Sequence, residues 1–279
     1  MKIIALIPAR MGSTRFPGKP LALILGKPMV GHVYERVSSL QSLSMTAVAT
    51  CDAEIYDYIY SIGGTAIMTN TSHTRASDRC AEALETLERI HNVVYDIVVM
   101  VQGDEPLIQP EMIDEALQPL IVDPTVNVVN LLGQINSQEE FEDRNCIKVV
   151  CDLNSDALYF SREPIPTRHN SHEIPIGKQV CVIPFRRNFL LEYTRMAPTP
   201  LEVAESIDML RILEHGMRVK MVPTLHKTYS VDTPQDLRSL EEYLITYKPR
   251  WPLPVAQRCW SRDHLVSVMT QTNLTRFWL

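Results

Sequence analysis

The sequence lacks any paired-cysteine motif. None of its six cysteines belongs to a CxxC pair, and no group of Cys and His has the spacing of zinc ligands. The cysteines are Cys51, Cys80, Cys146, Cys151, Cys181 and Cys259. Scattered thiols are typical of reduced proteins, so we expect a cytoplasmic location. The apolar run in the opening stretch MKIIALIPAR is too short for the hydrophobic part of a signal peptide, which agrees with that expectation.

Long apolar runs and an excess of positive charge are also missing. No segment approaches the roughly 20 apolar residues needed to span a membrane, so we expect no membrane partner. The net charge of −6 argues against a dedicated nucleic-acid binder, which is usually basic. Neither absence excludes a local basic pocket for a small anion.

Strand-like and helix-like segments alternate through the first part of the chain. The run at 2–7 is continuously apolar, as expected of a strand covered on both faces. Such alternation indicates an α/β fold with a mostly parallel sheet and helices on both faces. The expected strands are 2–7, 45–50, 65–68 and 96–106, and the expected helices are 28–39, 52–62 and 77–91.

The middle of the chain has a different pattern. Residues 146–162 are typical of two strands joined by a turn at 153–155, and 177–185 is typical of another strand. We therefore predict a small antiparallel insertion over about 146–190. It contains a long, proline-rich loop at 163–176, and loops of that length are often functional.

Thr-Pro pairs mark the start of two helices in the last third of the chain. They predict helices over 199–216 and 231–244. The stretch between them, 217–225, is typical of a strand. The last residues, 247–279, hold all three tryptophans and are predicted to be a C-terminal extension that packs on the domain or on a partner subunit.

The loop after the first strand concentrates positive charge and flexible backbone. Its sequence, PARMGSTRFPGKP, contains Arg10, Arg15 and Lys19. Five residues separate its two glycines and Pro20 follows the lysine, so the loop is not a Walker A motif. Glycines let backbone N–H groups approach an anion, and the three cations would neutralise phosphate charge. The loop therefore predicts a phosphate site, although a solvated turn with surface cations fits the same residues.

Two carboxylates are expected near this loop. Asp104 follows a buried strand in VQGDEP, and Asp232 precedes a predicted helix. Ligands of parallel sheets bind beyond the carboxyl ends of the strands. Two carboxylates facing phosphate would suit Mg²⁺, which takes few protein carboxylates and completes its shell with phosphate and water. The alternatives are a turn-forming role for Asp104 and helix capping for Asp232.

Five stretches of the sequence occur in an order and spacing that resemble one family. They are IPARMGSTRFPGKPL, VQGDEP, ALYFSREPIP, PTPLE with a following LR, and VDTPQDL. Over residues 2–246 the chain is similar to the 3-deoxy-manno-octulosonate (Kdo) cytidylyltransferases. The resemblance implies a Rossmann-like nucleotidyltransferase domain at 1–246 and a homodimer. It also implies transfer of CMP from CTP to a sugar acid, with release of pyrophosphate, in lipopolysaccharide biosynthesis.

The resemblance also implies roles for particular residues. Those expected to contact the nucleotide are Ala9, Arg10, Gly12, Ser13, Arg15 and Lys19. Those expected to act in catalysis are Arg10, Lys19, Asp104 and Asp232, of which the two aspartates would hold Mg²⁺. Those expected to contact the small anionic acceptor are Arg79, Gln102, Arg162, Gln179, Glu205 and Asp208.

The acceptor half departs from the family pattern. The family's His-x-Ser-Gly-Thr-(Asp/Glu)-Arg stretch is HTRASDR here, with Ala76 for Gly and Ser77 for Thr. Gln179 replaces a family His, Ile183 a Tyr and Met209 a Gln. Loss of polar side chains changes discrimination among hydroxyl-bearing substrates. We therefore predict CMP transfer to Kdo or a Kdo-like 2-keto-3-deoxy acid. The alternatives are a phosphonate or another nonulosonic acid as acceptor, or a non-catalytic nucleotide-binding paralogue.

Overall fold

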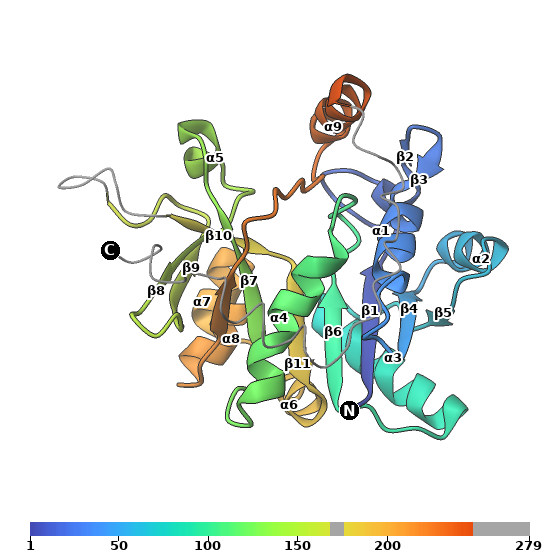
Figure 1. The fold of residues 1–279 in the computed structure, drawn as a ribbon, viewed down its shortest axis with the longest axis horizontal. Coiled ribbons are helices and arrows are strands. Elements are labelled where there is room, and N and C mark those ends of the chain that lie inside the picture. The colour runs from blue at the N-terminus through green and yellow to red at the C-terminus, as the bar shows by residue number, and fades with distance from the viewer. Residues whose placement is uncertain (168–175, 248–279) are drawn as a thin grey trace, which may run out of the picture. The chain divides into compact units, whose positions relative to one another are not determined.

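A five-stranded, mostly parallel sheet forms the centre of the fold. The computed structural model describes residues 1–167 and 176–247 (Figure 1). The strand order is β11-β6-β1-β4-β5, and only β11 runs antiparallel to its neighbour. The bounds are β1 (Ile3–Ala9), β4 (Met45–Thr50), β5 (Ala66–Met68), β6 (Ile97–Val101) and β11 (Val182–Arg186). The predicted α/β fold is therefore confirmed.

Helices cover both faces of this sheet because its strands are apolar on both sides. Along β1, Ile4 and Leu6 belong to one core with residues of α3, α6 and α8, while Ala5 and Ile7 belong to another with residues of α1, α2 and α4. The bounds are α1 (Met29–Ser38), α2 (Ala53–Ser61), α3 (Ala76–His91), α4 (Pro110–Val122), α6 (Arg187–Tyr193) and α8 (Met209–Glu214). Burial along the whole of β6 fixes the position of the residues that follow it.

A second five-stranded sheet, mostly antiparallel, lies beside the first (Figure 1). Its order is β12-β7-β10-β8-β9, with only the β12–β7 pair parallel. The bounds are β7 (Val129–Gln134), β8 (Lys148–Cys151), β9 (Ala157–Ser161), β10 (Gly177–Val180) and β12 (Lys220–Pro223). The predicted insertion at about 146–190 contains β8, β9 and β10, but the sheet also draws on β7 and β12 from outside that range.

The single strand predicted at 177–185 is wrong. The chain forms β10 in the second sheet and β11 in the central sheet, divided at Cys181. The Cys181 carbonyl accepts a hydrogen bond from the Gln102 backbone N–H at 3.0 Å. No Gly, Pro or other turn residue separates Val180 from Val182, so the pattern could not show that the two halves pair with different sheets.

The single helix predicted at 199–216 is also wrong, because Ser206 interrupts it. Ser206 has a φ of 55°, a left-handed conformation that ends α7 (Pro200–Glu205) before α8 begins. Good capping signals at both outer ends concealed this break in the middle. The remaining elements are η1 (Lys19–Leu21), β2 (Leu23–Ile24), β3 (Lys27–Pro28), α5 (Gln138–Glu142) and α9 (Pro234–Tyr247). The sequence prediction omitted α4, β7, α5 and α6.

Two sequence predictions fall largely outside the described residues. The C-terminal extension lies beyond them except for Tyr247, and the loop at 163–176 is described only at its two ends. Among the helices within 1–167 and 176–247, none combines the length and the apolar character needed to cross a membrane.

A two-pronged ion pair joins α3 to α6. Arg187 donates from Nε and Nη2 to the two carboxylate oxygens of Glu88 at 2.8 and 2.7 Å, and the Tyr95 backbone N–H adds a third bond at 3.0 Å. Burial alone would raise the pKa of Glu88, but these hydrogen bonds outweigh it and lower the pKa below 4.5. A carboxyl group whose pKa is lower in the folded than in the unfolded state stabilises the fold at pH values above its unfolded-state pKa. That stabilisation is lost as the pH falls through the folded-state pKa.

We expect Arg187→Met to lower the free energy of unfolding by about 2 kcal/mol at neutral pH, since hydrogen bonds to a charged group are worth that much. The deficit relative to the unmodified protein should shrink as the pH falls below about 4.5. Urea denaturation at several pH values measures both quantities. Arg218→Met is the matched control, because that side chain is 76% exposed and pairs with Asp156 at 3.6 Å. A deficit that is independent of pH would contradict the proposed role of the Glu88 charge.

Candidate active site

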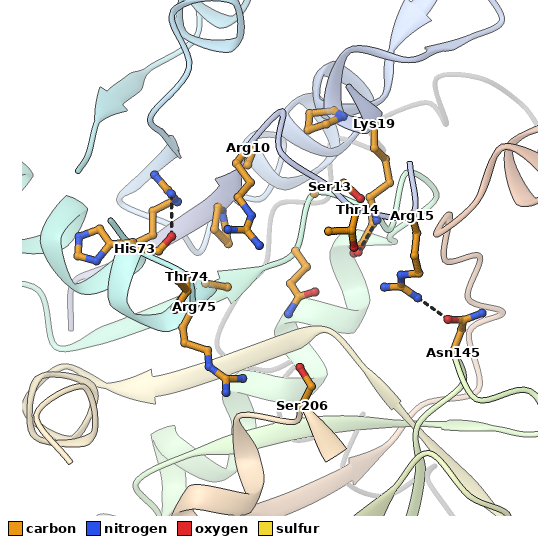
Figure 2. Close-up of a pocket in the computed structure, with 18 of the residues that line it drawn as sticks. Arg10, Ser13, Thr14, Arg15, Lys19, His73, Thr74, Arg75, Asn145 and Ser206 are labelled. Carbon is orange, nitrogen blue, oxygen red and sulfur yellow. Dashed lines mark hydrogen bonds and ion pairs between the residues drawn. The ribbon is translucent and has the colours of Figure 1, made fainter. Parts of the chain in front are cut away.

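A pocket of about 580 Å³ opens at the carboxyl ends of β1 and β6 (Figure 2). The loop after β1, the loop after β6 and the start of α3 form one part of its wall, and residues around the second sheet form the rest. Its lining residues are Pro8, Ala9, Arg10, Ser13, Thr14, Arg15, Lys19, Pro20, His73, Thr74, Arg75, Ala76, Arg79, Gln102, Gly103, Asp104, Arg144, Asn145, Arg162 and Ser206. The pocket therefore lies at the strand ends where the sequence predicts a ligand.

Backbone contacts hold the loop after β1 in a defined shape. The Met11 N–H donates to Asp52 Oδ2 at 2.7 Å, and the Met11 carbonyl accepts from the N–H groups of Ser13 and Gly18 at 2.9 and 3.0 Å. Gly18 has a φ of 74° where the chain enters η1, a conformation that glycine adopts without steric cost. This turn places Lys19 against the acidic side of the pocket.

Lys19 lies between the two predicted metal ligands. Its Nζ is 3.0 Å from Asp104 Oδ2 and 3.2 Å from Asp232 Oδ1. A backbone hydrogen bond of 2.9 Å from the Val231 N–H to the Asp104 carbonyl brings the two aspartates together. Burial of Lys19 would lower its pKa, but the two carboxylates outweigh burial and raise it above 10.5. Lys19 therefore remains a cation, and Arg15 adds a second ion pair to Asp232 at 3.0 Å.

This acidic pair fits a hard divalent cation. Both carboxylates direct an oxygen at the Lys19 ammonium group, so they lie close enough together to share one cation, which would take the place of that ammonium group. Mg²⁺ takes one or two carboxylates and finds its other ligands in phosphate oxygens and water. Asp104 lines the pocket and Asp232 lies directly beside it, so a bound phosphate would be in reach of such an ion.

Arg10 and Arg79 are the cations most available to an anion. Arg10 is exposed and has no hydrogen bond or ion pair within the described residues, and Figure 2 shows it directed into the pocket. Arg79 is 3% exposed, yet among the described residues its guanidinium donates to neutral oxygens only, Thr69 Oγ1 and the His73 carbonyl. Two cations without a carboxylate in contact make this part of the pocket strongly attractive to negative charge.

Arg162 lines the pocket but is largely occupied by the protein. It donates from Nε to the Glu205 carbonyl at 2.6 Å and from Nη1 to the Arg144 carbonyl at 2.9 Å. The Glu205 carboxylate in turn accepts from the Arg162 backbone N–H at 2.9 Å and from Ser161 Oγ at 3.1 Å. The structure thus places Glu205 outside the pocket, where it anchors the wall.

The other predicted residues divide between the pocket and its surroundings. Ala9, Ser13 and Gln102 line the pocket, whereas Gly12, Gln179 and Asp208 do not. Gln179 donates from Nε2 to Asn130 Oδ1 at 2.7 Å within the second sheet. Asp208 accepts from Arg75 and Ser77, and burial raises its pKa although Arg75 opposes that shift. The structure therefore brings together the predicted nucleotide residues more completely than the predicted acceptor residues.

Several pocket residues were not among the predicted site residues. They are Pro8, Thr14, Pro20, His73, Thr74, Arg75, Ala76, Gly103, Arg144, Asn145 and Ser206. Arg75 could have been found because it stands in the HTRASDR stretch that carries Arg79. Asn145 carries no local signal, and its contact with Arg15 Nη1 spans 130 residues of sequence, so only the fold reveals it.

Comparison with known proteins gives one consistent result. A family described as "Cytidylyltransferase" matches residues 4–219. A 3-deoxy-manno-octulosonate cytidylyltransferase of Geobacter metallireducens is 44% identical over 259 residues, which cover 89% of this chain and all of the relative. One of Syntrophus aciditrophicus is 43% identical, over 88% of this chain and 98% of the relative. A solved CMP:2-keto-3-deoxy-manno-octonic acid synthetase complexed with CTP matches with a TM-score of 0.80 and 36% identity, over 88% of this chain and all of that one.

Proposed function

Because this chain belongs to the cytidylyltransferase family that includes the 3-deoxy-manno-octulosonate cytidylyltransferases, we propose that it transfers CMP from CTP to Kdo or a Kdo-like acid. The oxygen of an acceptor hydroxyl forms a bond to the α-phosphorus, and the bond from that phosphorus to the oxygen bridging it to the β-phosphate breaks. Pyrophosphate leaves with that oxygen, and the hydroxyl proton passes to solvent. The observation that carries this proposal is the cluster of Lys19, Asp104 and Asp232 at the end of β1 and β6.

The loop after β1 provides the nucleotide side of the reaction. Arg10 is unpaired within the described residues and so can contact phosphate without breaking an existing ion pair. Lys19 and Arg15 add positive charge at the opposite end of the loop. Displacement at phosphorus depends on positioning and charge neutralisation more than on a protein nucleophile, which is what this loop can supply.

Asp104 and Asp232 are the residues that would hold Mg²⁺. When bound, the ion would neutralise phosphate charge and polarise the phosphoryl group. Lys19, which contacts both carboxylates in this structure, adds a cation at the same end of the pocket. Hydrogen bonds hold the backbone of both aspartates. The Asp104 carbonyl accepts from the Val231 N–H at 2.9 Å, and the Asp232 N–H donates to Asp236 Oδ2 at 2.9 Å.

Arg79 is the best candidate for the acceptor carboxylate. It lines the pocket, is almost fully buried and makes no hydrogen bond or ion pair to a carboxylate within residues 1–167 and 176–247. A guanidinium group matches the geometry of a carboxylate, and a buried one without a counter-ion favours an anionic ligand. We also propose that the enzyme is a cytoplasmic homodimer, which rests on the family resemblance and the scattered cysteines.

Pyrophosphate release tests the proposal directly. The protein is supplied with CTP and Mg²⁺ and a panel of Kdo, amino-substituted Kdo, other nonulosonic acids and simple phosphonates, with UTP as the control nucleotide. Turnover with CTP and a 2-keto-3-deoxy acid is the expected result. Turnover only with a phosphonate would replace the acceptor, and binding of CTP without release for any acid would favour a non-catalytic nucleotide-binding protein.

A further inference from the structure

Arg75 places a guanidinium group in the pocket from the residue just before α3. It lines the pocket together with Ser206, at the break between α7 and α8. Figure 2 shows its side chain reaching toward Ser206, away from Lys19 and Arg15. Arg75 therefore belongs to the part of the pocket beside Ser206 rather than to the part beside Lys19 and Arg15.

Two carboxylates, the partly buried Asp208 and the fully buried Glu202, fix the position of Arg75. Its Nη1 is 2.6 Å from Asp208 Oδ1, and its Nη2 is 3.2 Å from Glu202 Oε1. Ser77 Oγ donates to the other oxygen of Asp208 at 3.2 Å. Glu202 has no exposed surface and is held by Arg211 through bonds of 2.7 and 2.6 Å. The guanidinium cannot follow a ligand without breaking this network, so it presents a fixed surface to the pocket.

That surface can donate hydrogen bonds but cannot accept them. Arginine has five N–H donors and no acceptor, and the contacts to Asp208 and Glu202 leave some of those donors without a partner within the described residues. Neither of the two carboxylates lines the pocket itself. A ligand at this end therefore meets positive charge and free N–H groups.

No carboxylate is available here to receive a positively charged group. Among the described residues, Asp104 is the one acidic side chain that lines the pocket, and it is already bonded to Lys19. Arg10 and Arg79 add further positive charge to the same pocket. An ammonium group on the acceptor would thus face like charges, which specific sites use to exclude unwanted partners.

We propose that Arg75 sets the choice of acceptor, favouring sugar acids whose distal group accepts hydrogen bonds and excluding those that carry an ammonium group there. The distal group is a hydroxyl, carboxylate or phosphate oxygen that receives N–H bonds from Arg75. This inference rests on the proposed function, and it adds the chemical class of acceptor that the pocket takes.

The test compares two acceptors, Kdo and its analogue in which an amino group replaces the terminal hydroxyl. With saturating CTP and Mg²⁺ at neutral pH, kcat/KM should favour Kdo by about thirtyfold or more. Arg75→Met keeps the length of the side chain but removes the donors and the charge, and it should reduce that preference at least about tenfold, mainly through KM. Arg218→Met, far more exposed and outside the pocket, should leave the preference unchanged.

A second variant guards against misfolding. Arg75→Met leaves the partly buried Asp208 without its ion-pair partner. Arg75→Met with Asp208→Asn removes both charges and should show the same loss of preference. If the enzyme turns over Kdo and neither variant alters its preference for Kdo over the amino analogue, the role of Arg75 is overturned. The proposed function would remain intact. If no acid supports pyrophosphate release, the proposed function fails. In that case the role of Arg75 is tested by calorimetric binding of Kdo and its amino analogue to the CTP-loaded protein. Equal affinities for the two acids would overturn that role.

Discussion

Replacing Asp104 with Asn is expected to lower kcat for pyrophosphate release by about a thousandfold while the protein stays folded. The amide keeps the shape of the side chain but removes the charge that would bind Mg²⁺. It also leaves Lys19 with a single carboxylate partner, Asp232 at 3.2 Å. Measuring kcat over a range of Mg²⁺ concentrations should show a weaker dependence on the metal as well as a slower reaction.

Asp57→Asn is the control for that experiment, because Asp57 is an exposed carboxylate on α2 outside the pocket. It should retain the unmodified rate. Circular dichroism and urea denaturation establish that the Asp104 variant is folded. A folded Asp104→Asn protein with normal kcat and normal Mg²⁺ dependence would remove Asp104 from the metal site.

The second large effect is expected on stability, from Arg211→Met. Arg211 Nε and Nη2 bind the two oxygens of Glu202, and the Arg211 side chain is only 4% exposed. Its loss leaves a fully buried carboxylate with Arg75 as its remaining ion-pair partner at 3.2 Å. Because breaking one side of a buried pair strands a charge, we expect the free energy of unfolding to fall by about 3 kcal/mol.

The double variant Arg211→Met with Glu202→Gln separates the two causes of that loss. Removing both charges leaves no stranded carboxylate, so much of the stability should return. Urea denaturation of the single and double variants provides the comparison. If the double variant is as unstable as the single one, lost packing around Tyr193, whose ring lies 5.0 Å from the Arg211 guanidinium, explains the effect instead of charge.

The meeting of the residues proposed for the nucleotide side of the pocket could be predicted from the sequence because their signals are local. A strand followed by cations and glycines, and a second strand followed by Asp104, are visible in short stretches, and parallel strands end at one edge. The approach of Asp232 to Asp104 has a weaker local signal, because a carboxylate before a helix fits a capping role equally well. Its physical cause, the bond from the Val231 N–H to the Asp104 carbonyl, joins residues 127 positions apart.

The acceptor side was less predictable because it depends on which partner each polar residue finds. Gln179 and Glu205 have side chains suited to a sugar, yet they bond to Asn130 and to Ser161 inside the protein. Arg75 shows the reverse case. Its sequence neighbours Ala76, Ser77 and Arg79 carry a family signal, but its place in the pocket depends on Asp208, just before α8. Sequence shows which groups are polar, and only the fold shows which of them remain available.

At Cys181 the chain passes from the second sheet into the central sheet, and this crossing affects how the protein folds. One uninterrupted extended segment supplies β10 to the second sheet and β11 to the central sheet, and Val128 bridges to Phe185 between them. Neither sheet can complete its hydrogen bonding until this segment is in place. The two sheets are thus one cooperative folding unit with many contacts distant in sequence, and such topologies fold slowly. Partial unfolding that spares the nucleotide loop while releasing the acceptor wall is therefore disfavoured.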